Sequence, residues 1–235
     1  MTEPVPDLVT LQVWRVPTHR VGTALARLAL DRPSVRAVPG LRFAKLLGTG
    51  SGRTFSPWDA DLRRYALLAT WRSAADAARF RGSPLIRRWE RISAECWRVD
   101  LRPLSARGRW SRRTPFGDPV PTSIGPGPTA AITRARLVKR RIATFWLAVP
   151  PVAADLHGAA GLRLAMAVGE APVGLQGTFS LWDSAAALRD FAYQRPAHRQ
   201  VVRRTAEEHW YAEELFTRFA VVGGEGTING CDPLR

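Results

Sequence analysis

The chain has 235 residues, 46% of them hydrophobic, which is enough to bury a core as one large domain or two small ones. It contains no run of eighteen apolar residues, and Met1–Asp7 lacks the features of a signal peptide, so we expect a soluble cytoplasmic protein. Two cysteines, Cys96 and Cys231, are too few for a disulfide framework, and a formal net charge of +15 favours anionic partners.

The positive charge comes almost entirely from arginine, because Lys45 and Lys139 are the only lysines. These arginines are spread along the chain, which is typical of a solvated surface rather than of a binding tail. No recognised nucleic-acid-binding module occurs, so we expect no nucleic-acid partner. Peripheral association with an anionic membrane surface remains open.

The first half of the chain predicts alternating strands and helices. In chain order we expect a strand at Leu8–Val16, a helix at Val21–Val38 broken near Pro33, a strand at Leu41–Leu47, a strand ending at Trp71 with a helix after it, and a strand at Trp97–Leu104. This β-α-β-β-α-β order is that of a ferredoxin-like unit. Residues 1–110 therefore form the first predicted unit.

A stretch rich in proline and glycine, SRRTPFGDPVPTSIGPGP, separates this unit from the rest of the chain. Proline and glycine disfavour regular structure, so residues 111–128 are predicted to be a linker. The second unit is predicted at residues 129–224, and residues 225–235 are predicted to be a tail.

The second unit repeats the first. The segment LLATWRSAADAARF (Leu67–Phe80) matches TFSLWDSAAALRDF (Thr178–Phe191), which makes Trp71 and Trp182 equivalent. The other elements follow as a strand at Thr129–Leu137, a helix at Lys139–His157 with a kink or break at Pro150 and Pro151, and strands at Leu162–Val168 and Thr217–Val222. We therefore predict an α+β fold of two ferredoxin-like repeats whose sheets pack face to face as an α/β barrel. Two independent domains are the alternative.

Common catalytic signatures are missing from the sequence, including a phosphate-binding loop and a His-Glu-x-x-His motif. The glycine run GTGSG (Gly48–Gly52) does not open a helix, so a dinucleotide site is not expected. The run is interpreted as a hairpin connection between strands, or as a loop at the rim of a pocket.

Four histidines are the candidates for chemistry. His19 lies in a loop just before the first predicted helix, and His157 lies at a predicted helix end; both have structural roles in this interpretation. His209 follows two glutamates and ranks second. His198 ranks first because it follows Pro196 at a predicted helix start, and aligning the repeats on their prolines places it opposite an isoleucine, Ile86. A histidine in only one copy of a duplicated fold suits a metal ligand, and an exposed helix histidine is the alternative.

Several stretches resemble the spheroidene monooxygenase family over nearly the whole chain: VPGLRFAKL (Val38–Leu46), GTGSG (Gly48–Gly52), LRPLSARGRW (Leu101–Trp110), TFSLW (Thr178–Trp182) and WYAEELFTRF (Trp210–Phe219). The resemblance implies a haem-dependent oxygenase that oxidises a methylene of an acyclic carotenoid twice, so that the geminal diol loses water to give a ketone. The topology is also similar to the haem-binding α/β barrels of chlorite dismutases and aldoxime dehydratases, in which a helix histidine binds the iron.

Roles for individual residues follow from this resemblance. His198 would bind the iron of one haem b in the second repeat, while Gln176, Thr178 and Ser180 on one strand face would donate hydrogen bonds on the opposite side of the haem. The remaining expected contacts are the haem propionates with Arg199 or Arg203, and the macrocycle with Phe145, Trp146 and Phe191. The alternatives are a solvated strand face, surface arginines and ordinary core aromatics. The expected partners are an apolar small-molecule substrate, oxygen and an electron donor, and a homo-oligomer remains open.

Two other functions are consistent with the sequence. A haem-dependent dehydratase or peroxidase-like enzyme would share the iron ligand and differ in the residues around the substrate. A haem-free α/β barrel would be a binding module for another small molecule.

Overall fold

A computed structural model of the chain describes residues 2–53, 57–120, 127–170 and 175–235. It leaves out a few further side chains, namely those of Arg36, Pro57, Leu175, residues 196–199, Val202 and Ala206. The described elements fall into two halves of the same order. Between the third and fourth strands of each half, however, there are two helices where the expected β-α-β-β-α-β order has one, and the second of these in the second half begins at the predicted helix start at Pro196.

The elements of the first half are β1 (Leu8–Arg15), η1 (Thr18–Arg20), α1 (Val21–Arg36), β2 (Leu41–Gly50), η2 (Pro57–Asp59), β3 (Ala60–Trp71), α2 (Ala74–Arg81), α3 (Pro84–Ile92) and β4 (Glu95–Gly108). Those of the second half are β5 (Thr129–Leu137), η3 (Lys139–Arg141), α4 (Ile142–His157), β6 (Leu162–Gly169), β7 (Leu175–Trp182), α5 (Ala185–Gln194), α6 (Pro196–Glu208) and β8 (Tyr211–Gly226).

Proline explains the additional helices. Pro84 and Pro196 each occupy the first turn of a new helix, α3 and α6. Proline favours that position and disfavours helical geometry in the residue before it, so the chain breaks there. The breaks predicted inside the long helices are absent in the described chain, because α1 runs through Pro33 and α4 runs through Pro150 and Pro151.

The eight described strands form one closed barrel in the order β1-β3-β2-β6-β7-β5-β8-β4. Each half supplies a four-stranded sheet, and the sheets are hydrogen-bonded edge to edge, β2 with β6 and β4 with β8. The expected α+β barrel of two ferredoxin-like repeats is confirmed. The two sheets face each other across the interior and are also joined at their edges. The edge pairing satisfies backbone N–H and C=O groups that open edges would leave unpaired.

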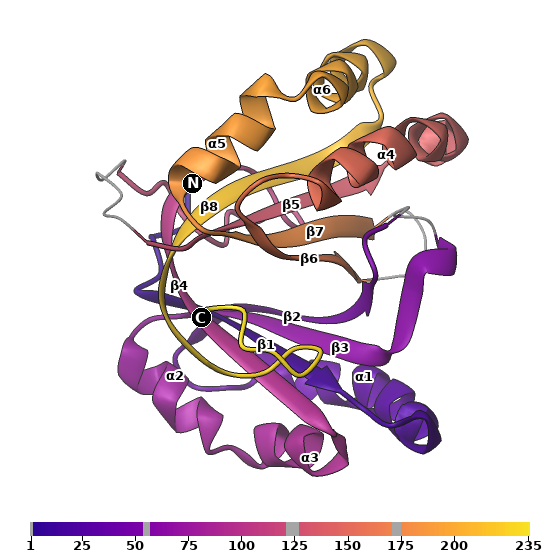
Figure 1. Cartoon of the computed structure of the whole chain (residues 1–235). Helices are drawn as coiled ribbons and strands as arrows, with labels where there is room; N and C mark the ends of the chain where they lie inside the picture. The colour runs from indigo at the N-terminus through magenta and orange to yellow at the C-terminus, as the bar shows by residue number, and fades with distance from the viewer. Residues whose placement is uncertain (1, 54–56, 121–126, 171–174) are drawn as a thin grey trace.

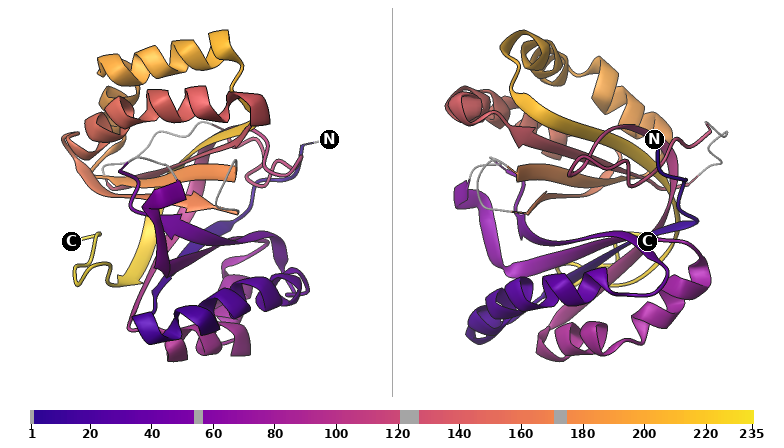
Figure 2. Two further views of the ribbon diagram at one scale, coloured as in Figure 1. Left: turned by 90° about the vertical axis from the view of Figure 1, so that its right-hand side faces the viewer. Right: turned by 180° about the vertical axis from the view of Figure 1, so that it is seen from behind.

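The helices of each half cover the outside of their own sheet. Helices α1 to α3 lie on one side of the barrel and α4 to α6 on the opposite side (Figure 1), and the same separation is visible in both views of Figure 2. None of the helices in the described part of the chain combines the length and apolar content that crossing a membrane requires.

The barrel interior is an apolar core to which both halves contribute. It includes Leu11, Trp97, Phe179 and Phe219, each at most 1% exposed. Two segments that the sequence predicts as linker and tail also contribute, because Phe116 is fully buried and Ile228 is 5% exposed in the same cluster. The linker and tail predictions therefore did not anticipate that Phe116 and Ile228 pack into the core.

The glycine run predicted as a hairpin connection lies largely within a strand. Gly48, Thr49 and Gly50 belong to β2 and pair with Gly169, Val168 and Ala167 of β6. A side chain at residue 50 would place its Cβ 2.8 Å from the carbonyl oxygen of Asp59. The run is thus part of the seam between the halves, where small residues allow close backbone approach.

Candidate active site

Each sheet has an inner face in the barrel and an outer face beneath its own helices. Alternation along the strands separates the two faces. In the first half the outer face and the helices form one buried apolar cluster. Trp89 of α3 is fully buried in it, stacked on Trp14 with ring centroids 5.0 Å apart and tilted against Tyr65 at 5.4 Å. This aromatic triad (Trp14, Tyr65 and Trp89) fills the layer between the sheet and the helices.

Strand register identifies the equivalent positions in the second half. Trp71 is paired with Leu8, and Trp182 is paired with Thr129 in the same way. Counting along the strands from these pairs, the cross-strand pair Trp14–Tyr65 corresponds to Ala135–Gln176. Two large aromatic side chains of the first half are therefore replaced by an alanine and a glutamine in the second.

The same loss of volume occurs at the neighbouring positions. The outer-face pair Leu46–Leu67 of the first half corresponds to Ala167–Thr178. On the helix side, aligning Pro84 with Pro196 places Val201 at the position of Trp89. All three members of the aromatic triad are thus replaced by smaller residues, and the outer-face positions around them, Ala135, Ala167, Gln176 and Thr178, are small or polar. We call the space between this face and α4 to α6 the second-half layer.

Two polar atoms of the second-half layer are buried without a partner among the described residues. They are the amide oxygen Oε1 of Gln176 on β7 and the indole nitrogen Nε1 of Trp146 on α4. A buried polar atom that lacks a hydrogen bond costs about 1–3 kcal/mol. Such atoms are candidates for contact with a bound group, although Trp14 Nε1 in the filled first half also has no partner in the described part of the chain, so the smaller side chains of the second half carry the argument.

The other residues predicted for the site occupy several environments. Thr178 is half-buried on the same face as Gln176, whereas the Ser180 hydroxyl accepts a hydrogen bond from Trp182 Nε1 at 2.9 Å. Phe191 of α5 is 9% exposed and packs on Trp182 with centroids 5.2 Å apart. Phe145 of α4 contacts Trp210 and Tyr211 edge to face.

Arg203 is 72% exposed on α6 and pairs with Glu207 at 3.6 Å. His198 and Arg199 are in the first turn of α6, and their side chains lie outside the described residues. The equivalent of His198 in the first half, Ile86, is 3% exposed and borders a cavity of only 10 Å³ together with Leu67 and Phe80. The position on the first-half helix that corresponds to His198 therefore faces the sheet.

The remaining histidines have exposed or structural positions. His19 lies in η1, and His157 ends α4, where its Nδ1 is 2.8 Å from the carbonyl oxygen of Ala153. His209 caps α6 in the left-handed backbone conformation, with φ 49°, and its side chain is exposed.

Two proteins of similar sequence align with most of this chain. A spheroidene monooxygenase of Rhodobacter capsulatus is 33% identical over 223 residues, which cover 92% of this chain and 90% of that protein. Another, of Rubrivivax gelatinosus, is 38% identical over 194 residues, covering 82% of this chain and 73% of that protein. The chain belongs to the spheroidene monooxygenase family. This confirms the resemblance seen in the sequence, although no protein-family model matches the chain.

Solved structures confirm the barrel fold of this spheroidene monooxygenase family member. An aldoxime dehydratase in complex with butyraldoxime has a TM-score of 0.63 at 11% identity, covering 96% of this chain and 83% of that chain. A second aldoxime dehydratase has a TM-score of 0.58 at 11% identity, covering 91% and 80%. At this level of identity the likeness shows the fold alone.

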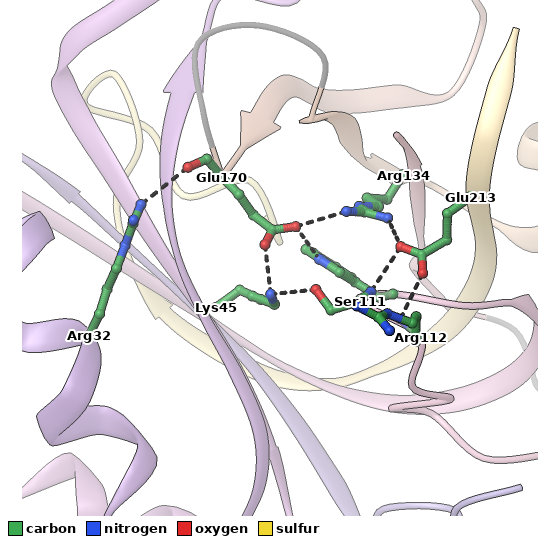
Figure 3. Close-up of polar contacts among 8 residues, drawn as sticks. Arg32, Lys45, Ser111, Arg112, Arg134, Glu170 and Glu213 are labelled. Carbon is green, nitrogen blue, oxygen red and sulfur yellow. Dashed lines mark hydrogen bonds and ion pairs between the residues drawn. The ribbon is translucent and has the colours of Figure 1, made fainter. Parts of the chain in front are cut away.

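Apart from the second-half layer, a polar cluster lies at one mouth of the barrel in this family member (Figure 3). Glu170, just after β6, accepts hydrogen bonds from Lys45 Nζ and Trp110 Nε1, both at 2.6 Å, and from Arg134 Nη2 at 3.1 Å. Arg134 also donates to Glu213 of β8, and it is 4% exposed. This barrel-mouth cluster links the first half to the second.

Glu213 additionally holds the start of the connecting segment. Its carboxylate accepts from the backbone N–H groups of Ser111 and Arg112 at 2.9 and 2.6 Å, and both residues have positive φ, 53° and 63°. Burial raises the pKa of Glu213, but these two N–H groups and Arg134 outweigh it, so the pKa lies below its usual value. Burial also raises the pKa of Glu170, but the hydrogen bonds and charges of Lys45, Trp110 and Arg134 outweigh it, so this pKa is lowered as well. The cluster thus contains two cations, Lys45 and Arg134, and two carboxylates, Glu170 and Glu213, that pair with one another. Because these charges are balanced within the protein, the cluster is suited to a structural role.

Sequence reasoning missed the small residues that distinguish the second half. It selected His198, Gln176 and Thr178 because their side chains can bind a metal or form hydrogen bonds, whereas the methyl side chains of Ala135 and Ala167 can do neither. The signal was present in the repeat, because aligning the strands on Trp71 and Trp182 compares each outer-face residue with its equivalent.

Proposed function

We propose that this protein is a haem-dependent monooxygenase that oxidises an apolar polyene in the second-half layer. The observation that carries the proposal is the replacement of the aromatic triad by Ala135, Gln176 and Val201. Large-to-small changes leave space unless the neighbours collapse. A flat macrocycle would occupy such a space, and the unpartnered atoms of Gln176 and Trp146 fit a site that contacts a bound group.

In this proposal His198 binds the haem iron from α6, and haem supplies the activation of dioxygen with electrons from a donor. Arg199 or Arg203 pairs with the propionates, which requires Arg203 to exchange its exposed contact with Glu207. Trp146 and Phe191 contribute apolar contact on the helix side. The haem is proposed for the second half because the equivalent layer of the first half is filled.

Gln176 and Thr178 are proposed to act from the sheet side. Both lie on the outer face of β7, where an amide and a hydroxyl are the donors nearest to the lost aromatic positions. Their hydrogen bonds would orient the reacting oxygen and hold a proton close to it, since each is neutral and able to donate and accept. The alanines beside them keep the rest of the face apolar, which suits a hydrocarbon substrate.

The names of the relatives suggest that the substrate is spheroidene or a similar acyclic carotenoid. In each oxidation one atom of dioxygen would enter a C–H bond, while two electrons and two protons reduce the other atom to water. A second oxidation at the same methylene gives a geminal diol, which loses water to form a ketone. Because such a substrate dissolves in lipid and the chain carries a net charge of +15, residence at an anionic membrane surface is part of the proposal.

The test compares absorption spectra of unmodified protein, His198→Ala and His209→Asn, all expressed with added haem. We expect a haem Soret band with about one haem per chain in the unmodified protein and in His209→Asn, and its loss in His198→Ala. Asparagine tolerates the left-handed backbone of residue 209, so this variant is a matched control. An unmodified protein that stays free of haem would overturn the proposal and favour a haem-free binding module.

A further inference from the structure

A cleft of 560 Å³ opens at one end of the second half, where α4 turns into β6 and β7 turns into α5. Its walls include Ala159, Ala160 and Gly161 from the first turn, and Ala187 and Phe191 from α5. The volume falls within the range of about 300–1,000 Å³ that is typical of small-molecule sites.

The first half shows how this region is filled when no cleft is present. Gly40 and Gly161 are equivalent, since their carbonyl groups accept from Arg72 and Asp183 at 2.9 and 2.8 Å respectively. At Gly40, an added Cβ would lie 2.1 Å from the side chain of Asp76, which occupies the space in front of the glycine.

In the second half, the position equivalent to Asp76 is Ala187, by the alignment on Trp71 and Trp182. The Cβ of Ala187 also lies in front of its glycine, 2.7 Å from a Cβ added at Gly161, but alanine has no carboxylate beyond that atom. Two neighbouring residues also lose volume, because Val38 and Pro39 of the first half correspond to Ala159 and Ala160. The loss of volume in the second half thus extends from the second-half layer to this surface.

The charges at the rim of the cleft already have partners within the chain. Asp183 pairs with Arg163 at 2.5 Å, and Arg195 pairs with Asp155 at 3.7 Å. The Asp190 carboxylate accepts from Gln194 Nε2 at 3.0 Å. A charged ligand would have to displace these contacts, whereas an apolar ligand would leave them intact and cover the alanines and Phe191.

Phe191 lies between the cleft and the second-half layer. Its ring lines the cleft and packs on Trp182, and both belong to the apolar cluster that includes Ala131 on the outer face of β5. These three side chains are at most 9% exposed, so the cleft and the layer lie on two sides of one buried apolar cluster.

We propose that this cleft binds the extended end of the apolar substrate, a linear polyene, with Ala187 as the residue that keeps it open. The inference rests on the proposed function, since it assigns the place of the substrate outside the haem site. Tryptophan at position 187 would fill the cleft in the way that Asp76 fills the corresponding space of the first half.

The test measures binding of all-trans-retinol, an uncharged fluorescent polyene, to haem-free and haem-loaded protein by its increase in fluorescence. Ala187→Trp is compared with Ala186→Trp, which adds the same side chain at an exposed position of α5 that does not line the cleft. We expect Ala187→Trp to weaken retinol binding by about tenfold or more, about 1.4 kcal/mol, and Ala186→Trp to leave it unchanged.

A second variant, Ala160→Trp, adds bulk at an exposed loop position of the cleft wall and keeps the test valid if Ala187→Trp does not fold. Circular dichroism reports the fold of each variant, and the Soret band reports its haem content. Retinol affinity equal to that of the unmodified protein in the folded cleft variants would overturn this inference. Failure of the proposed function looks different, because the unmodified protein would then take up no haem whether or not retinol binds.

Discussion

Exchanging one pair of equivalent residues tests whether the second-half layer is open. Trp14 and Ala135 occupy the same position in the two halves, and Trp14 is fully buried against Trp89 at 5.0 Å. Truncating a buried tryptophan to alanine costs about 3–5 kcal/mol. At about 2–4 °C per kcal/mol for a chain of this size, Trp14→Ala should lower the Tm by roughly 6–20 °C.

The reverse change, Ala135→Trp, should behave differently. In a closely packed layer an added indole costs about 1–3 kcal/mol or more through overpacking. In an open layer it fills space beside Gln176, so the haem-free protein should lose less than about 1 kcal/mol. The same indole would occupy the proposed haem site, and we therefore expect the Soret band to disappear.

Urea unfolding of the haem-free proteins gives the free energies, and haem titration gives the stoichiometry. Ala69→Trp is the matched control, because Ala69 is 1% exposed on the filled outer face of the first half and should show the full cost of overpacking. The reasoning is refuted if Ala135→Trp is destabilised as much as Ala69→Trp, or if it binds haem as well as the unmodified protein does.

Two further predictions concern other parts of the molecule. At the barrel mouth, Glu213→Gln should lower the free energy of unfolding at pH 7 by about 1.5–3 kcal/mol, since charged hydrogen bonds to Arg134 are lost. The lowered pKa of Glu213 means that its stabilisation is present above the unfolded carboxyl pKa of about 4.3 and is lost as the pH falls through the folded value. The difference between the two proteins should thus shrink below about pH 4, and a difference that does not change with pH would contradict this account. Burial raises the pKa of Cys96 to about 11, whereas Cys231 is exposed, so iodoacetamide at pH 8 should label native protein once and Cys231→Ser hardly at all by mass spectrometry.

The fold was predictable because the repeat is visible in local sequence. Trp71 and Trp182 each end a strand and precede a serine that caps a helix, with Ser73 accepting from Asp76 N and Ser184 from Ala187 N. These signals depend on residues a few positions apart. The edge-to-edge closure was not predictable in the same way, since the described residues of β2 meet β6 through three residue pairs that lie over 110 residues apart in the chain.

The barrel-mouth cluster shows why long-range polar contacts escape sequence analysis. Lys45, Arg134, Glu170 and Glu213 come from four separate strands or strand ends, and each looks like an ordinary surface charge in its own segment. Only closure of the barrel brings them together around the buried guanidinium of Arg134. The candidate site was partly predictable, because His198 and Gln176 drew attention through their residue types, whereas Ala135 is informative only by comparison with Trp14.

The difference between the halves follows from how a duplicated fold can combine stability with binding. A pocket lowers stability, because each large side chain that is removed forfeits about 3–5 kcal/mol of packing, which is a large share of the total for a domain. In this barrel the first half retains the aromatic triad, and the β4–β8 seam and the barrel-mouth cluster couple it to the second half. The packed half can thus offset the lost packing of the second half. This predicts an asymmetry that either half alone would not show: binding of haem should stabilise the second half most, and hydrogen exchange should slow in α4 and α6 while α1 and α3 remain unchanged.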